Sequence, residues 1–109
     1  MEINFKSRKL ATVLNSSKQI DRKYGSSAKK IKIRLNDMAM VENLEKLMAL
    51  PGRHHPLTGD RDGQFACDLE HPLRLIYQPD NEPLPIDDNN TLIYSKVTIV
   101  EIIEITDYH

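Results

Sequence analysis

The sequence predicts an α+β domain, in which an N-terminal strand and a helical hairpin pack on a curved, mainly antiparallel sheet of four or five strands. Three observations lead to this prediction. Apolar residues recur every three or four positions between residues 10 and 48, which is typical of helices. After Pro51 they alternate with polar residues, which is typical of half-buried strands. The 109 residues suffice for one modest core, so residues 1–109 are expected to form a single domain.

The N-terminal half predicts one short strand followed by helices. Ile3 and Phe5 alternate with polar residues, which is the pattern of a strand. Two short helical segments follow, and Gly25 is expected to end the second. Pro51-Gly52 is expected to end the helical half, because proline cannot continue a helix. A longer helix between these stops, with a kink before its last turns, has its apolar positions at Ala28, Ile31, Leu35, Met38, Ala39, Val41, Leu44, Leu47 and Met48.

Three strands are predicted in the second half, over Gln64–Leu69, Leu73–Gln78 and Leu92–Thr106. The stretch PDNEPLPIDDNNT before the last strand is acidic and rich in proline, so we expect a long hairpin loop there. Cys67 has the parity of core residues and is expected to be an inert, packed thiol. Helices on one face of the sheet would leave the other face open for a ligand or partner. Strict alternation along the last strand places Val97, Ile99, Glu101, Ile103 and Ile105 on one face, and Val100, Ile102 and Glu104 on the other.

Composition excludes several classes of protein. Hydrophobic residues make up 39% and charged residues 28% of the chain, as in folded globular domains. The sequence has no run of 18 apolar residues and no apolar N-terminal stretch like that of a signal peptide, so we expect neither a membrane span nor export. The single cysteine can form no intrachain disulfide, and together these features favour a cytoplasmic location.

The net charge of −1 hides an uneven distribution. Residues 1–35 hold ten Lys and Arg against two acidic residues (+8), and residues 36–109 hold five against fourteen (−9). A positive third of the chain suggests an acidic partner, either nucleic acid or an acidic protein segment. A solvated helix face would have the same composition, so both interpretations stay open. In the longer predicted helix, the cations that could contact RNA are Lys29, Lys30, Lys32 and Arg34.

The titratable residues favour acid–base chemistry that needs no metal or cofactor. The four histidines form no metal-binding pattern, and the sequence has no glycine-rich phosphate loop. Arginines and histidines near strand ends can meet on one face of a sheet. Cleavage of RNA by its own 2′-hydroxyl needs such a set, with one group removing the 2′-proton, another protonating the 5′-oxygen, and guanidinium groups stabilising the phosphorane. The candidates are His54, His55, Arg61, Arg74, Asp107, Tyr108 and His109.

Two segments resemble a known family. LPGRHHPLTGDRDGQFACDLEHPLRLIYQP (Leu50–Pro79) and VEIIEITDYH (Val100–His109) resemble the RelE/HigB-type toxins of type II toxin–antitoxin pairs, also called plasmid maintenance system killer proteins, of the RelE/ParE superfamily. The resemblance implies a ribosome-dependent endoribonuclease, or mRNA interferase, that inhibits translation. It also implies a cognate antitoxin, commonly a helix-turn-helix DNA-binding protein, through which alone the pair would contact and repress its operator DNA.

The resemblance also implies roles for individual residues. His55 and His109 would transfer protons, in an order that the sequence does not fix. Arg61 and Arg74 would hold phosphate. The terminal motif would supply three more groups: Tyr108 to stack on a base or position the phosphate, Asp107 to orient a neighbour, and His109 itself. The catalytic residues implied are thus His55, Arg61, Arg74, Asp107, Tyr108 and His109.

Less specific interpretations stand beside these. Arg74 could instead bridge to Asp68 or Glu70 across a hairpin, and His54 is expected at the surface. Two other functions also stay open. A ParE-like toxin would inhibit a topoisomerase without cutting RNA, although such chains generally lack the terminal His and Tyr. A catalytically inactive relative would only bind antitoxin and take part in operon autoregulation, which the acidic bias of residues 36–109 and the missing aromatic at Leu73 would fit.

Overall fold

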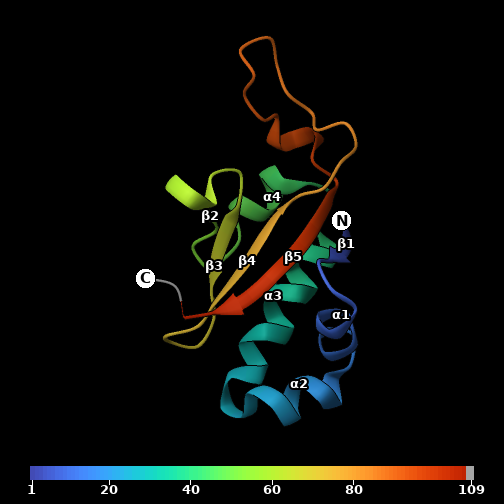
Figure 1. Cartoon of the computed structure of the whole chain (residues 1–109), viewed down its shortest axis with the longest axis vertical. Helices are drawn as coiled ribbons and strands as arrows, with labels where there is room; N and C mark the ends of the chain where they lie inside the picture. The colour runs from blue at the N-terminus through green and yellow to red at the C-terminus, as the bar shows by residue number, and fades with distance from the viewer. Residues whose placement is uncertain (108–109) are drawn as a thin grey trace.

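In the computed structural model, which describes residues 1–107, the chain forms one five-stranded sheet with helices packed against one face (Figure 1). Short 3₁₀ turns cover residues 25–27, 59–61 and 94–96. No helix of this part of the chain has the length and apolar character needed to cross a bilayer. The main elements are β1 (Glu2–Phe5), α1 (Arg8–Leu14), α2 (Ser17–Tyr24), α3 (Ala28–Met40), α4 (Leu44–Met48), β2 (His55–Pro56), β3 (Phe65–Asp68), β4 (Arg74–Pro79) and β5 (Ile99–Thr106).

The strand order is β1-β5-β4-β3-β2, with β1 parallel to β5 and the other pairs antiparallel. The predicted α+β class is therefore confirmed. The last strand is an interior strand, because the first strand of the chain returns to pair with it. This pairing places the N-terminal strand at one edge of the sheet and the two-residue β2 at the other.

Polar side chains set the ends of the helices. The hydroxyls of Ser7 and Ser16 accept from the backbone N–H groups at the start of α1 and α2. Gly25 ends α2 with φ of +51°, a left-handed conformation that glycine adopts without strain. The expected kink is a complete break, because α3 ends at Met40 and Asn43 caps a separate helix, α4.

The main core lies between the helices and one face of the sheet. Leu14, Ile20 and Ile31 from the helices are buried in it. The sheet contributes the alternate residues of β3 and β4, as their periodicity predicted. Cys67 is fully buried there, and burial raises the pKa of its thiol to about 12, in agreement with the expected inert packing role. The strand residues of this core are Phe65, Cys67, Leu75, Tyr77, Val100 and Ile102.

The last strand is shorter than predicted. It begins at Ile99 and not at Leu92, because residues 92–98 form hydrogen bonds to other segments. Asn81 Oδ1 accepts from the backbone N–H groups of Thr98 and Ile99, and the backbone oxygen of Val97 accepts from Leu44 N at 3.0 Å. The segment from 80 to 98 is therefore a long connection that projects beyond the ends of β4 and β5, away from α2 (Figure 1).

The prediction of strict alternation along the last strand was also wrong. The register pairs Ile76 with Glu104 but Tyr77 with Ile102, so Ile103 is an extra residue in a β-bulge. Ile102 and Ile105 consequently both contact the main core, although their parities differ. Ile103 packs instead in a second cluster with Leu57, Ala66 and Ile76. The sheet face away from the helices is therefore not entirely open, because this small apolar cluster occupies part of it.

His54 is buried, contrary to the surface position expected from the sequence. Only 8% of its surface is exposed, and its Nδ1 lies 2.8 Å from the hydroxyl of Tyr77. The two rings meet edge to face at 5.8 Å. Burial, together with repulsion from the Arg34 guanidinium, lowers the pKa of His54 from 6.5 to about 4.

This burial predicts a loss of stability in mild acid. Because the pKa of His54 is lower in the folded state, protonation favours the unfolded state, and stability should fall as pH decreases from 6.5 towards 4. The full effect is at most about 3 kcal/mol in the free energy of unfolding. Urea titrations across this pH range measure it. His54→Asn should flatten the pH dependence, whereas the matched change at exposed His71 should not; equal slopes for both variants would contradict the assignment.

Candidate functional site

Asp68, the last residue of β3, brings two arginines together. Its carboxylate accepts from Arg53 at 2.6 Å from Nε and 3.2 Å from Nη2. Arg74 lies directly opposite on β4, and its Nε is 3.4 Å from Asp68 Oδ1. The hydrogen bond from Arg53 and the nearby charges of Arg53, Arg74 and His55 lower the pKa of Asp68. The carboxylate therefore stays ionised and holds both guanidinium groups at this end of the sheet.

The backbone of Asp68 anchors the turn that carries Arg53. Its N–H donates to the carbonyl of Gly52 at 2.7 Å, and its carbonyl accepts from Arg34 Nε on α3 at 2.9 Å. Gly52 has φ of +113°, and a Cβ there would lie 2.6 Å from Arg34 Nε. Arg53 itself has φ of +50°, a left-handed conformation that non-glycine residues seldom adopt. Such strain is frequently found at functional residues.

His55 lies on the same sheet face as this pair. The register places it opposite Ala66, then Ile76 and Glu104 on the following strands, so these side chains share the face away from the helices. Its Nδ1 lies 2.6 Å from the carbonyl of Arg53. Because a carbonyl oxygen only accepts, Nδ1 must carry a proton, which leaves Nε2 as the nitrogen that can exchange one.

Arg61 reaches this face from the β2–β3 connection. It lies in a 3₁₀ turn that leads into Asp62 and Gly63, where φ of −55° and then +89° give the shape of a type II turn. Its guanidinium donates to Glu104 at 3.0 Å and to Gln64 at 2.9 Å. Since Glu104 is in the same row as His55, Arg61 is the third arginine on this face.

The register places His55 and Arg74, both predicted from the sequence, on one face of the sheet, and Arg61 reaches the same face through Glu104. Asp107 follows Thr106, which is opposite Arg74 in the register, and its side chain is exposed. Tyr108 and His109 lie outside the described residues. The alternative interpretation of Arg74, an ion pair with Asp68, is also present. The ion pair leaves other N–H donors of Arg74 available, so it is compatible with phosphate binding, which stays a prediction.

The predicted basic patch on α3 is partly neutralised within the protein. Lys32 pairs with Asp21 at 2.6 Å, Lys30 lies 3.6 Å from Glu70, and Arg34 is half-buried on the Asp68 carbonyl. Lys29 is exposed. These contacts account for three of the four cations, so their role in RNA binding stays a prediction.

Sequence reasoning missed Arg53 and the organising role of Asp68. Arg53 follows Pro51-Gly52, a pair typical of a tight turn, and directly precedes the two histidines. This position was the signal that could have identified it. For Asp68 the sequence offered only a possible bridge to Arg74, because its second partner, Arg53, lies 15 residues before it in a turn. Within residues 1–107, no group of three or more His, Cys, Asp and Glu side chains is placed to hold a metal ion.

Comparison with known proteins identifies the architecture. No protein-family model matches the chain, and no curated protein matches it. Among solved structures, the YoeB/ParE toxin from Agrobacterium tumefaciens superposes with a TM-score of 0.60, over 100% of both chains and at 14% sequence identity. The chain has the fold of this toxin. At that identity the likeness concerns the fold, and the site residues rest on the geometry described above.

The turn at Gly52 provides a test of how the arginines are held. Gly52→Ala should lower the free energy of unfolding by about 2 kcal/mol or more, because the methyl group meets Arg34 and the left-handed backbone is strained. Gly63→Ala is the matched control: its φ is +89°, but the added methyl group meets no atom within 4 Å, so about 1 kcal/mol is expected. Urea denaturation measures both. Equal losses would argue against a close contact between Arg34 and the turn.

Proposed function

We propose that this protein is the toxin of a type II toxin–antitoxin system and cleaves mRNA on the ribosome by acid–base catalysis. The observation that carries the proposal is the set of Arg53, Arg74 and His55 gathered around Asp68 on the sheet face away from the helices. Guanidinium groups recognise phosphate through paired N–H donors, and an imidazole transfers protons near neutral pH. The shared fold with a YoeB/ParE toxin and the sequence resemblance described above point to the same class.

Asp68 positions the arginines without exhausting them. It uses Nε and Nη2 of Arg53 and contacts Nε of Arg74. Because a guanidinium has five N–H donors, each arginine keeps donors for a second acceptor. An RNA phosphate could therefore bind beside the carboxylate, and Arg61 on Glu104 would extend the positive face.

The chemistry would be transfer of the phosphate between oxygens of the RNA itself. A base removes the proton of the 2′-hydroxyl, the 2′-oxygen bonds to phosphorus, and the bond from phosphorus to the 5′-oxygen breaks. An acid protonates the leaving 5′-oxygen, so the products are a 2′,3′-cyclic phosphate and a 5′-hydroxyl. His55 Nε2 would serve in one of these proton transfers, and His109 in the other, while the arginines stabilise the phosphorane. Tyr108 would position the scissile nucleotide, and Asp107 would orient a neighbouring group.

The proposed partners follow from this activity. The ribosome would present the mRNA, and a cognate antitoxin, expected to be a helix-turn-helix DNA-binding protein, would neutralise the toxin. Operator DNA would be contacted only through that antitoxin. The exposed Lys29 and the other α3 cations would make secondary contacts to RNA, at the cost of the internal pairs that now hold Lys30 and Lys32.

A second candidate is a toxin or toxin relative that does not cut RNA. The internal pairing of the α3 cations and the ion pairs at Asp68 leave a modest positive surface, and the matched structure is described by both a YoeB and a ParE name. Such a protein would act on a topoisomerase or only bind antitoxin. A topoisomerase inhibitor predicts growth arrest without breaks in mRNA, and a relative that only binds antitoxin predicts no arrest.

Expression without antitoxin separates these functions. The chain should arrest growth and produce new mRNA 5′ ends inside translated codons, mapped by sequencing. His55→Ala and Arg74→Gln should each reduce cleavage about 100-fold or more, because each removes a group that acts on the transition state. Arg22→Gln on α2 is a control of equal charge change at an exposed position. Arrest with intact mRNA would favour a topoisomerase inhibitor, and no arrest would favour a relative that only binds antitoxin.

The terminal residues give an independent test. Ending the chain after Asp107 removes Tyr108 and His109 and should abolish cleavage, while binding to the co-expressed antitoxin persists. His109→Ala alone should reproduce most of the loss. Cleavage by the truncated protein, measured as the same mRNA 5′ ends, would show that the proton transfers depend on other groups.

A further inference from the structure

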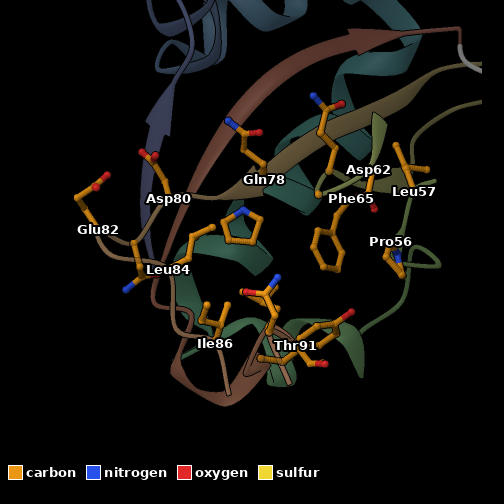
Figure 2. Close-up of a pocket in the computed structure, with 17 residues that line it drawn as sticks. Pro56, Leu57, Asp62, Phe65, Gln78, Asp80, Glu82, Leu84, Ile86 and Thr91 are labelled. Atoms are coloured by element: carbon orange, nitrogen blue, oxygen red, sulfur yellow. The ribbon is translucent and has the colours of Figure 1, made fainter. Parts of the chain in front are cut away.

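A cavity of about 750 Å³ lies at the opposite end of β4 from Arg74, between the sheet and the long 80–98 connection (Figure 2). The proposed cleavage uses none of the residues that line it. Gln78 and Pro79 at the end of β4, Pro56 of β2 and Phe65 of β3 form the sheet side. Leu84, Ile86 and Thr91 form the side of the connection.

The cavity is largely apolar and is bordered by exposed hydrophobic side chains. The ring of Phe65 is stacked on Tyr77 and meets Tyr94 edge to face at 5.5 Å, so it is fixed in place. Across from it, Leu84 and Ile86 are each 48% exposed (Figure 2). Large apolar side chains at the edge of a cavity commonly mark a binding site.

Specific hydrogen bonds hold this cavity open. The side chain of Asn81 bonds to the Thr98 hydroxyl and to the backbone of residues 98 and 99. Asp87 Oδ1 accepts from the backbone of residues 89 and 91, and Ile93 N donates to Pro85 O at 2.8 Å. Asp80 accepts from Asn4 on β1 at 3.0 Å. These hydrogen bonds fix the conformation of the connection away from the sheet, so the cavity is pre-formed.

The charge of the cavity is uniformly negative. Asp62 lines it on the sheet side, and Asp80 and Glu82 line it on the side of the connection (Figure 2). None of its 17 lining residues is Lys, Arg or His. An RNA phosphate or a carboxylate ligand would be repelled, whereas a Lys or Arg side chain would be attracted.

We propose that this cavity binds a basic polypeptide segment of a partner protein, with an apolar side chain seated against Phe65 and flanking Lys or Arg side chains beside Asp62 and Glu82. Leu84 and Ile86 would be covered by the apolar part of that segment. The proposal does not depend on the catalytic activity. Residues 74 and 78 of β4 are separated by about 13 Å at the rise of a strand, so the segment would leave the Asp68 cluster accessible.

The experiment is a titration of the ¹⁵N-labelled full chain with synthetic peptides, followed by backbone amide shifts. The probe is acetyl-Lys-Leu-Lys-Leu-Lys-amide, with a Lys-Ser peptide and a Glu-Leu peptide as matched controls for the apolar and the charged part. The Lys-Leu peptide should shift the amides of Leu84, Ile86, Thr91 and Gln78 saturably. The Lys-Ser peptide should bind at least about fivefold more weakly, and the Glu-Leu peptide should not bind.

Variants locate the contact. Leu84→Ser with Ile86→Ser should weaken binding of the Lys-Leu peptide about tenfold, and Glu82→Gln should weaken it and reduce its dependence on salt. Asp88→Asn is the control, because Asp88 is exposed on the same connection but does not line the cavity. Amide chemical shifts that match those of the unsubstituted chain away from the variant sites would show that each variant is folded.

Three outcomes would overturn the proposal. The first is equal binding of the Lys-Leu and Glu-Leu peptides, or shifts confined to other surfaces. The second is a shift of the cavity amides by oligouridine, which would make RNA the occupant. The third is a shift of the same amides with protein concentration alone, which would make a second copy of the chain the occupant.

Discussion

The interactions of Asp68 connect four parts of the molecule. Its backbone joins β3 to the Gly52 turn and to Arg34 of α3, while its carboxylate joins Arg53 of the turn to Arg74 of β4. The left-handed backbone of Gly52 and Arg53 is required for this geometry. The same turn delivers His54 to the core and His55 to the surface, since adjacent residues of an extended segment point in opposite directions. The position of His55 thus depends on the interaction that gathers the arginines.

The sheet separates two sites of opposite charge. Arg53 and Arg74 lie around Asp68 at the end where β4 begins, and Asp62, Asp80 and Glu82 surround the cavity at the end where it stops. One chain with a net charge of −1 can therefore offer separate surfaces to a nucleic acid and to a basic protein segment. The positive charge counted in the sequence is only partly available at the surface, because Lys30 and Lys32 pair with carboxylates and Arg34 is half-buried on a backbone carbonyl.

Periodicity was enough to predict the fold class, the strands of the second half and the buried thiol of Cys67, because burial of one face dictates those patterns. It failed where a contact distant in sequence decides the outcome. The bulge at Ile103 changes the parity of β5. That strand begins only at Ile99, whose backbone N–H donates to Asn81. His54 is buried beside Tyr77, whose hydroxyl lies within hydrogen-bond distance of its Nδ1. Sequence reasoning named His55, Arg61 and Arg74, which lie on one sheet face, whereas Arg53 and its pairing with Asp68 required the structure.

The central claim is that the arginines around Asp68 hold an RNA phosphate. The most direct measurement is the salt dependence of binding between the full chain and mRNA-programmed ribosomes. Each phosphate contact contributes a slope of roughly 0.7–0.9 in a plot of log K against log salt concentration. The Arg53→Gln, Arg74→Gln double variant should bind more weakly, with the slope reduced by roughly 0.7–0.9, the contribution of the one phosphate that both arginines would hold. An unchanged affinity and slope would contradict the account.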